Sequence, residues 1–170
     1  CLTGLPAYFS KDKVPQEDFE LACMASASMP AFSDMIRIRG VPYLDGGCAC
    51  PIPINWALQQ GFDKIVVVAT REKGFRKKQP SQRMVNLYDD FYGDKPLFLA
   101  TLLTQEIRYN ALMDQLDELE ADDRICVIRP DEPIGIGRFE VDTEKLTELY
   151  LRGYKEMQQK LDGMMQYLEK

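Results

Sequence analysis

The sequence predicts an α/β fold, specifically a layered αβα sandwich around a mostly parallel sheet. Runs rich in Val and Ile alternate with segments whose apolar residues recur at helical spacing, a pattern typical of strands joined by helical crossovers. The chain has 170 residues, of which 45% are hydrophobic, so it fits one domain with a sizeable core. No apolar run approaches the roughly 18 residues that a membrane-spanning helix needs.

The elements are expected in a definite order. Strands are expected at residues 5–9, 35–39, 41–44, 64–70 and 124–128, and helices at residues 15–24, 53–60, 81–92, 96–119 and from Asp142 or Thr143 onward. The continuous run at 64–70 is typical of a strand covered on both faces. Pro15, followed by acidic residues, and Thr143 with Glu144 are typical helix starts, and Gly61 is a typical helix end.

Composition excludes several kinds of chemistry. The net charge is −6, which disfavours nucleic acid as a partner. Histidine is absent, so acid–base work falls to carboxylates, Lys, Tyr or Cys. The five cysteines have no CxxC spacing, and we expect buried, reduced thiols, no metal and no cofactor. The chain opens on Cys1 rather than Met, and we expect a processed or trimmed chain.

The segment VPYLDGGCACPIP, residues 41–53, presents the strongest candidate site. Asp45 follows a strand directly, where open α/β sheets place functional residues. Gly46 and Gly47 let the backbone adopt positive φ and leave room for a neighbouring segment. Asp-Gly is also a common turn pair, and from the residues alone a turn and a functional carboxylate stay equally open. Cys48 and Cys50 are expected to pack under a tight loop.

A basic loop follows the apolar run at 64–70. Its five basic residues and Phe75 make it a candidate for contact with anionic membrane headgroups, and a solvated loop is the simpler alternative. The residues of this candidate contact are Arg71, Lys73, Phe75, Arg76, Lys77 and Lys78. Gly135-Ile136-Gly137 lacks the third glycine of a dinucleotide fingerprint.

Taken in order, these motifs resemble the bacterial patatin-like phospholipases. The quoted segments are TGLPAYF (residues 3–9), ASASMPAF (25–32), GVPYLDGG (40–47), PIP (51–53), GFDKIVVV (61–68), Thr70-Arg71 with the basic loop, and the tail from Arg129-Pro130 to LYLRGY (149–154). The resemblance covers nearly the whole chain. It predicts that residues 1–170 are the C-terminal portion of a single patatin-like α/β hydrolase domain.

The resemblance implies a Ser–Asp dyad that hydrolyses lipid acyl esters, with Asp45 as the base and Gly46 and Gly47 shaping its loop. The glycine-rich oxyanion loop and the GxSxG nucleophile of the family do not occur in the 170 residues, and Ser26 and Ser28 lack the flanking glycines. We therefore expect this chain alone to be inactive and to require the missing N-terminal half of the same domain as a partner. A lipid ester is the expected substrate. The expected location is the cytoplasm, and peripheral contact with the membrane is left open.

Two alternatives stay open. The first is a non-catalytic patatin-like module that binds a partner or a membrane surface. The second is a nucleotide-binding α/β protein, which the lack of a P-loop or a complete glycine fingerprint disfavours.

Overall fold

The structure is a computed structural model that describes residues 1–137 and 139–170. It divides into two compact units. Unit 1 contains Cys1–Pro53 and Lys77–Ala111, and unit 2 contains Ile54–Arg76 and Leu112–Lys170. One helix, α5 (Gln105–Ala121), contributes its first two turns to unit 1 and the remainder to unit 2.

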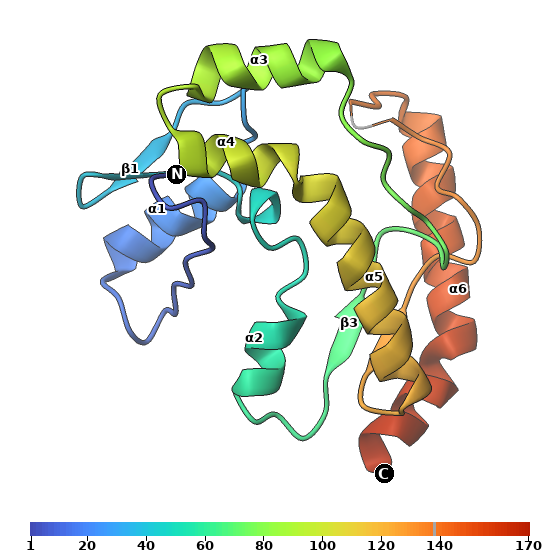
Figure 1. Ribbon diagram of the computed structural model, residues 1–170. Helices are drawn as coiled ribbons and strands as arrows, with labels where there is room; N and C mark the ends of the chain where they lie inside the picture. The colour runs from blue at the N-terminus through green and yellow to red at the C-terminus, as the bar shows by residue number, and fades with distance from the viewer. Residues whose placement is uncertain (138) are drawn as a thin grey trace. The chain divides into compact units, whose positions relative to one another are not determined.

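Unit 1 contains three helices besides the start of α5, one hairpin and a 3-10 turn. These are α1 (Gln16–Ser26), β1 (Ile36–Ile38), β2 (Val41–Tyr43), η1 (Gly46–Cys48), α3 (Gln82–Tyr92) and α4 (Pro96–Leu103) (Figure 1). Strands β1 and β2 pair antiparallel, with Ile38 opposite Val41. The two residues between them, Arg39 and Gly40, have φ values of 50° and 81°, as a tight two-residue hairpin turn requires.

The core of unit 1 joins η1 to α3 and α4. Its buried members are Leu44, Cys48, Tyr92, Phe98 and Leu102. The rings of Tyr92 and Phe98 meet edge to face, with their centroids 5.0 Å apart, and the Tyr92 hydroxyl accepts a 2.8 Å hydrogen bond from the backbone N–H of Ala31. Cys48, the last residue of η1, therefore packs in one cluster with side chains of α3 and α4.

Unit 2 contains α2 (Ile54–Gln59), β3 (Val66–Val68), β4 (Cys126–Ile128), α6 (Thr143–Glu169) and the second part of α5. Strands β3 and β4 pair parallel, with Val66 opposite Cys126. Near its C-terminal end, helix α6 is bonded to the residues that precede both strands, because the Tyr167 hydroxyl accepts from Ile65 N at 3.1 Å and donates to the Arg124 carbonyl at 3.0 Å.

The prediction of an α/β fold is confirmed, but the layered sandwich is not. The described residues form two sheets of two strands each, of which one is antiparallel and one is parallel. The expected strand at 64–70 shortens to β3, and Val68 is 74% exposed, so the prediction of cover on both faces is wrong at this residue. A β-branched run reports strand propensity and says nothing of which neighbours cover it.

Two expected elements differ from the structure. Residues 5–9 form no strand and lie as irregular backbone. The single helix expected at 96–119 is two helices, because α4 ends at Leu103 and α5 begins at Gln105. Thr104 lies at the junction, and its hydroxyl donates to the Ala100 carbonyl at 2.8 Å. A threonine that bonds back to the carbonyl four residues earlier bends a helix.

In the part of the chain that the structure describes, no helix combines the length and the apolar character that crossing a membrane requires.

Candidate functional site

Asp45 lies two residues after the end of β2 and caps η1. Its Oδ1 accepts a 2.7 Å hydrogen bond from the backbone N–H of Gly47, and its carbonyl accepts from Cys48 N at 3.1 Å. The Asp45 N–H donates to the Ser28 carbonyl at 2.9 Å, just beyond the end of α1. Asp45 is therefore bonded both to its own loop and to Ser28. Residues 45–50 are called the aspartate loop below.

The two glycines of this loop serve a different purpose from the one expected. Neither Gly46 nor Gly47 has a positive φ, so the expectation of left-handed backbone is wrong. A Cβ on Gly47 would lie 3.1 Å from Asp45 Oδ1, whereas a Cβ on Gly46 would meet nothing within 4 Å. A side chain at Gly47 would thus crowd the carboxylate, whereas the backbone conformation at Gly47 does not itself call for glycine.

A cavity of about 90 Å³ lies beside the carboxylate. Residues lining it include Gly4, Phe9, Ala25, Ser26, Tyr43 and Asp45. Among the described residues, none donates a hydrogen bond to Asp45 Oδ2. The loop therefore bonds one oxygen of the half-buried carboxylate and leaves the other without a hydrogen bond from the described residues.

Gly4 brings the segment 3–9 against α4 and makes it a wall of this cavity. Its φ is +67°, and a Cβ there would lie 2.3 Å from Thr101 Oγ1 and 2.5 Å from the Leu97 carbonyl oxygen. The Thr101 hydroxyl donates to the Gly4 carbonyl at 2.9 Å. Both the left-handed backbone and the close contact require glycine at this position.

Cys48 is a buried thiol of the core, as expected, and is 4% exposed. Burial, followed by the nearby Asp45 charge, raises the pKa of Cys48 to about 12. All five cysteines are free, but Cys23 is exposed, so the expectation of buried thiols is wrong there. In the described ranges, 1–137 and 139–170, no three Cys, Asp or Glu side chains are grouped to hold a metal ion.

Two side chains of α5 that the sequence does not single out also contact the aspartate loop. Gln105 Nε2 donates to the Gly47 carbonyl at 2.8 Å. The Arg108 guanidinium donates to the carbonyls of Cys48 and Ala49 at 2.7 and 2.5 Å. About sixty residues separate these partners in the chain, so no local sequence signal identifies them.

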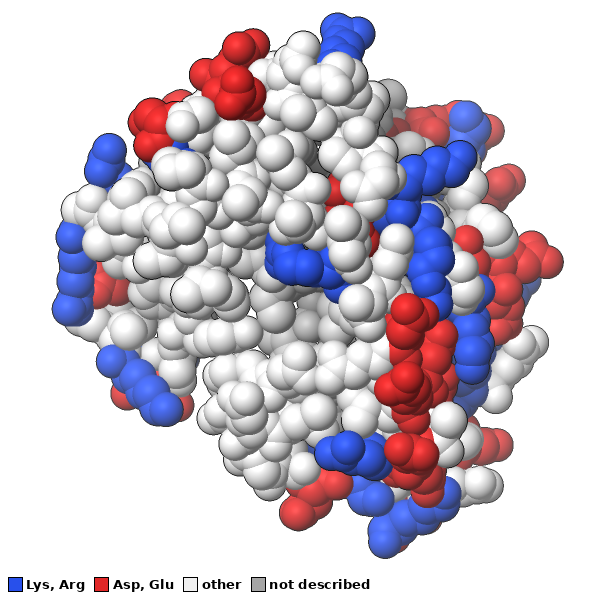
Figure 2. All heavy atoms as spheres, in the orientation of Figure 1, with Lys and Arg blue, Asp and Glu red and all other residues white. Residues whose placement is uncertain are grey.

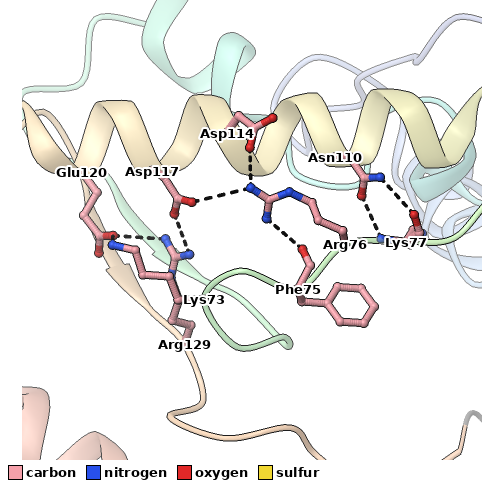
Figure 3. A network of polar contacts seen from close by, with 9 residues as sticks. All are labelled: Lys73, Phe75, Arg76, Lys77, Asn110, Asp114, Asp117, Glu120 and Arg129. Atoms are coloured by element: carbon pink, nitrogen blue, oxygen red, sulfur yellow. Dashed lines mark hydrogen bonds and ion pairs between the residues drawn. The ribbon is translucent and has the colours of Figure 1, made fainter.

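The cations of the basic loop are largely engaged within the chain. In unit 2, Arg76 forms an ion pair with Asp114, and Lys73 Nζ lies 3.6 Å from Glu120 Oε2 (Figure 3). The Arg71 guanidinium lies 4.8 Å from the centroid of the Phe75 ring. Figure 2 shows acidic side chains in a row over α5 with basic side chains beside them.

In unit 1, the end of the same loop is fixed through its backbone. Asn110 Oδ1 accepts from Lys77 N at 2.8 Å, and Asn110 Nδ2 donates to the Lys77 carbonyl at 3.0 Å (Figure 3). The side chain of Lys78 is exposed. Contact of this loop with a membrane stays a prediction.

Two family models match the chain. Residues 2–58 match the model described as Patatin-like phospholipase, and residues 95–169 match the model described as Domain of unknown function (DUF6363). No curated protein and no solved structure matches the chain. The resemblance to patatin-like phospholipases, a family of lipid hydrolases, is therefore supported for the segment that contains the aspartate loop.

The predicted extent and position of that resemblance are wrong. We predicted that nearly the whole chain is the C-terminal portion of a patatin-like domain, but the match lies at the N-terminal end of the chain. Residues 95–169 match a different model. Apolar strands and amphipathic helices such as those at 61–154 recur in many α/β proteins, so their order is weak evidence of one family. That residues 1–170 form a single domain stays a prediction.

Proposed function

We propose that Asp45 is the general base of a Ser–Asp dyad in a lipid acyl hydrolase. The observation that carries the proposal is the unequal hydrogen bonding of the two oxygens of the Asp45 carboxylate. Oδ1 is held by Gly47 N–H, and Oδ2 accepts no hydrogen bond from the described residues and lies in a residue that lines a cavity. The segment that contains it is similar to patatin-like phospholipases.

In this proposal, Oδ2 takes the proton from a serine hydroxyl as the serine oxygen bonds to the acyl carbon of the ester. The protonated carboxyl then gives that proton to the departing alcohol oxygen, which leaves an acyl-serine. Attack by water, with the carboxylate again as base, releases the fatty acid and restores the serine.

The serine is proposed to come from polypeptide outside residues 1–170. Ser26 lies at the end of α1, where the helix dipole is negative and opposes the charge of an oxyanion. The cavity of about 90 Å³ is also smaller than the roughly 300–1,000 Å³ of typical ligand pockets. Further protein surface is therefore needed to hold an acyl chain. We also propose that, together with this further polypeptide, the strands form a larger layered sheet.

The test compares Asp45→Asn with Asp34→Asn, an exposed aspartate of unit 1, in the intact protein that carries these residues. We expect Asp45→Asn to lower hydrolysis of a nitrophenyl ester by at least about 100-fold, with an unchanged circular dichroism spectrum, and Asp34→Asn to remain active. The 170-residue chain alone is expected to be inactive.

Full activity in a folded Asp45→Asn variant would overturn the assignment of the base. That result would instead favour the alternative of a non-catalytic module that binds a partner or a membrane surface.

A further inference from the structure

We propose that Gln105 and Arg108 are positioning residues that hold the aspartate loop in its working geometry; this rests on the proposed function of Asp45. Three consecutive loop carbonyls accept hydrogen bonds from these two side chains of α5. Gln105 Nε2 donates to the first carbonyl at 2.8 Å, and Arg108 Nη2 and Nη1 donate to the second and third at 2.7 and 2.5 Å. All of these groups belong to unit 1.

The loop needs these donors because its own backbone leaves the carbonyls without partners. Just after η1, the N–H groups of Ala49 and Cys50 both donate to the Gly46 carbonyl, at 3.1 and 2.8 Å. The next three carbonyls, those of residues 47–49, accept no hydrogen bond from a backbone N–H of the described residues. Carbonyls at a helix end need an outside donor, and a cation is favoured there.

The guanidinium of Arg108 is itself oriented by the break between α4 and α5. Its Nη2 also donates to the Thr101 carbonyl at 2.7 Å, and its Nε lies 3.4 Å from Thr104 Oγ1. One planar group therefore joins the last turn of α4 to the loop. Lysine has a single point charge and does not reproduce this fork of donors.

The restraint reaches the proposed base through one residue. Gly47 donates its N–H to Asp45 Oδ1 and accepts from Gln105 with its carbonyl. These two groups belong to the peptide units on either side of the Gly47 Cα, so holding the carbonyl restricts the position of the N–H that orients the carboxylate. Because a misplacement of about 1 Å in an active site can cost about 100-fold in rate, loss of this restraint is expected to lower turnover.

The experiment uses Arg108→Met, Arg108→Lys and Gln105→Leu in the intact protein, with Arg83→Met, an exposed arginine of α3, as the matched control. The first readout is the alkylation rate of Cys48, resolved from the other cysteines by peptide mass spectrometry. The second is kcat and KM for ester hydrolysis.

We expect Arg108→Met to raise Cys48 alkylation about 10-fold and to lower kcat by about 10- to 100-fold with KM nearly unchanged. Arg108→Lys should fall between this variant and the wild type, and Arg83→Met should match the wild type. Where Arg108→Met fails to fold, Arg108→Lys and Gln105→Leu carry the test.

An unchanged Cys48 alkylation rate in the folded variants would overturn the proposal, as would faster alkylation with unchanged kcat. Failure of the proposed function gives a different pattern. Asp45→Asn would then retain hydrolysis, while the Arg108 variants would still alkylate faster at Cys48. That pattern would mean that Arg108 restrains the loop but that the loop has no part in catalysis.

Discussion

The backbone N–H of Gly47 lies 2.7 Å from Asp45 Oδ1, and a methyl group on Gly47 would lie only 3.1 Å from the same oxygen. Because neither this glycine nor Gly46 has a positive φ, alanine is compatible with the backbone at both positions. Comparing an alanine substitution at each of the two glycines therefore separates the effect of the contact with Asp45 from the effect of backbone conformation.

Gly46→Ala is expected to leave the free energy of unfolding unchanged or to raise it by up to about 1 kcal/mol, since alanine restricts the unfolded chain and meets nothing in the fold. Gly47→Ala gains the same entropy but must displace the carboxylate, so we expect it to be less stable than Gly46→Ala by about 1 kcal/mol. Urea denaturation measures both. Equal stabilities would show that the loop absorbs the methyl group.

Local chemistry made several elements predictable. Helices α3 and α6 begin within one residue of the expected positions, and in the structure Ser81 and Asp142 each accept a hydrogen bond from the first turn of the helix that follows. The hairpin at Gly40 and the position of Asp45 two residues after β2 are likewise set by residues close in the chain. These features depend on neighbours within a few positions.

The side-chain contacts that the sequence did not predict join residues that are far apart in the chain. Nothing near Arg108 indicates that its guanidinium bonds to carbonyls at Cys48 and Ala49. The pairing of Arg76 with Asp114 likewise joins residues 38 positions apart, and it changes the charge that the basic loop presents. Side-chain hydrogen bonds across the fold leave no periodic pattern, so the sequence indicates Asp45 as a candidate base but does not indicate the side chains of α5 that contact its loop.

Arg129 is expected to be the most important cation for the stability of unit 2. Its side chain is 11% exposed and bonds Asp117 at 2.8 Å and Glu120 at 3.2 Å. Arg129→Met leaves two half-buried carboxylates side by side, and we expect unfolding free energy to fall by about 2–3 kcal/mol in urea denaturation. Lys170→Met, which breaks an exposed pair with Asp123, should cost less than about 1 kcal/mol. Similar losses in the two variants would contradict this ranking.

Membrane contact by the basic loop has a specific electrostatic test. Because Arg76 is paired with Asp114, part of the loop's positive charge is neutralised within the chain. Asp114→Asn should raise the affinity for phosphatidylserine-containing vesicles, measured by co-sedimentation, about five-fold, because one released cation is worth about 1 kcal/mol near an anionic surface. Asp123→Asn changes the net charge equally at a different pair. If the two variants bind alike, the loop is not the contact.

Alkaline pH is expected to destabilise the fold through Cys48. Burial raises the pKa of its thiol from 9.0 in an unperturbed cysteine to about 12. Below about pH 9, the thiol is protonated in both the folded and the unfolded chain, and its contribution to stability is complete. Above that pH, the unfolded chain releases the proton while the folded chain retains it. Stability is therefore lost as pH rises through the interval from 9 to about 12.

Each pH unit in that interval costs at most about 1.4 kcal/mol. Other groups also titrate there, so the informative quantity is the difference in unfolding free energy between the wild type and Cys48→Ala, measured in urea at several pH values. We expect that difference to be constant up to about pH 8.5 and then to shift against the wild type. A difference that stays flat to about pH 10.5 would mean that Cys48 ionises as readily in the folded chain as in the unfolded one.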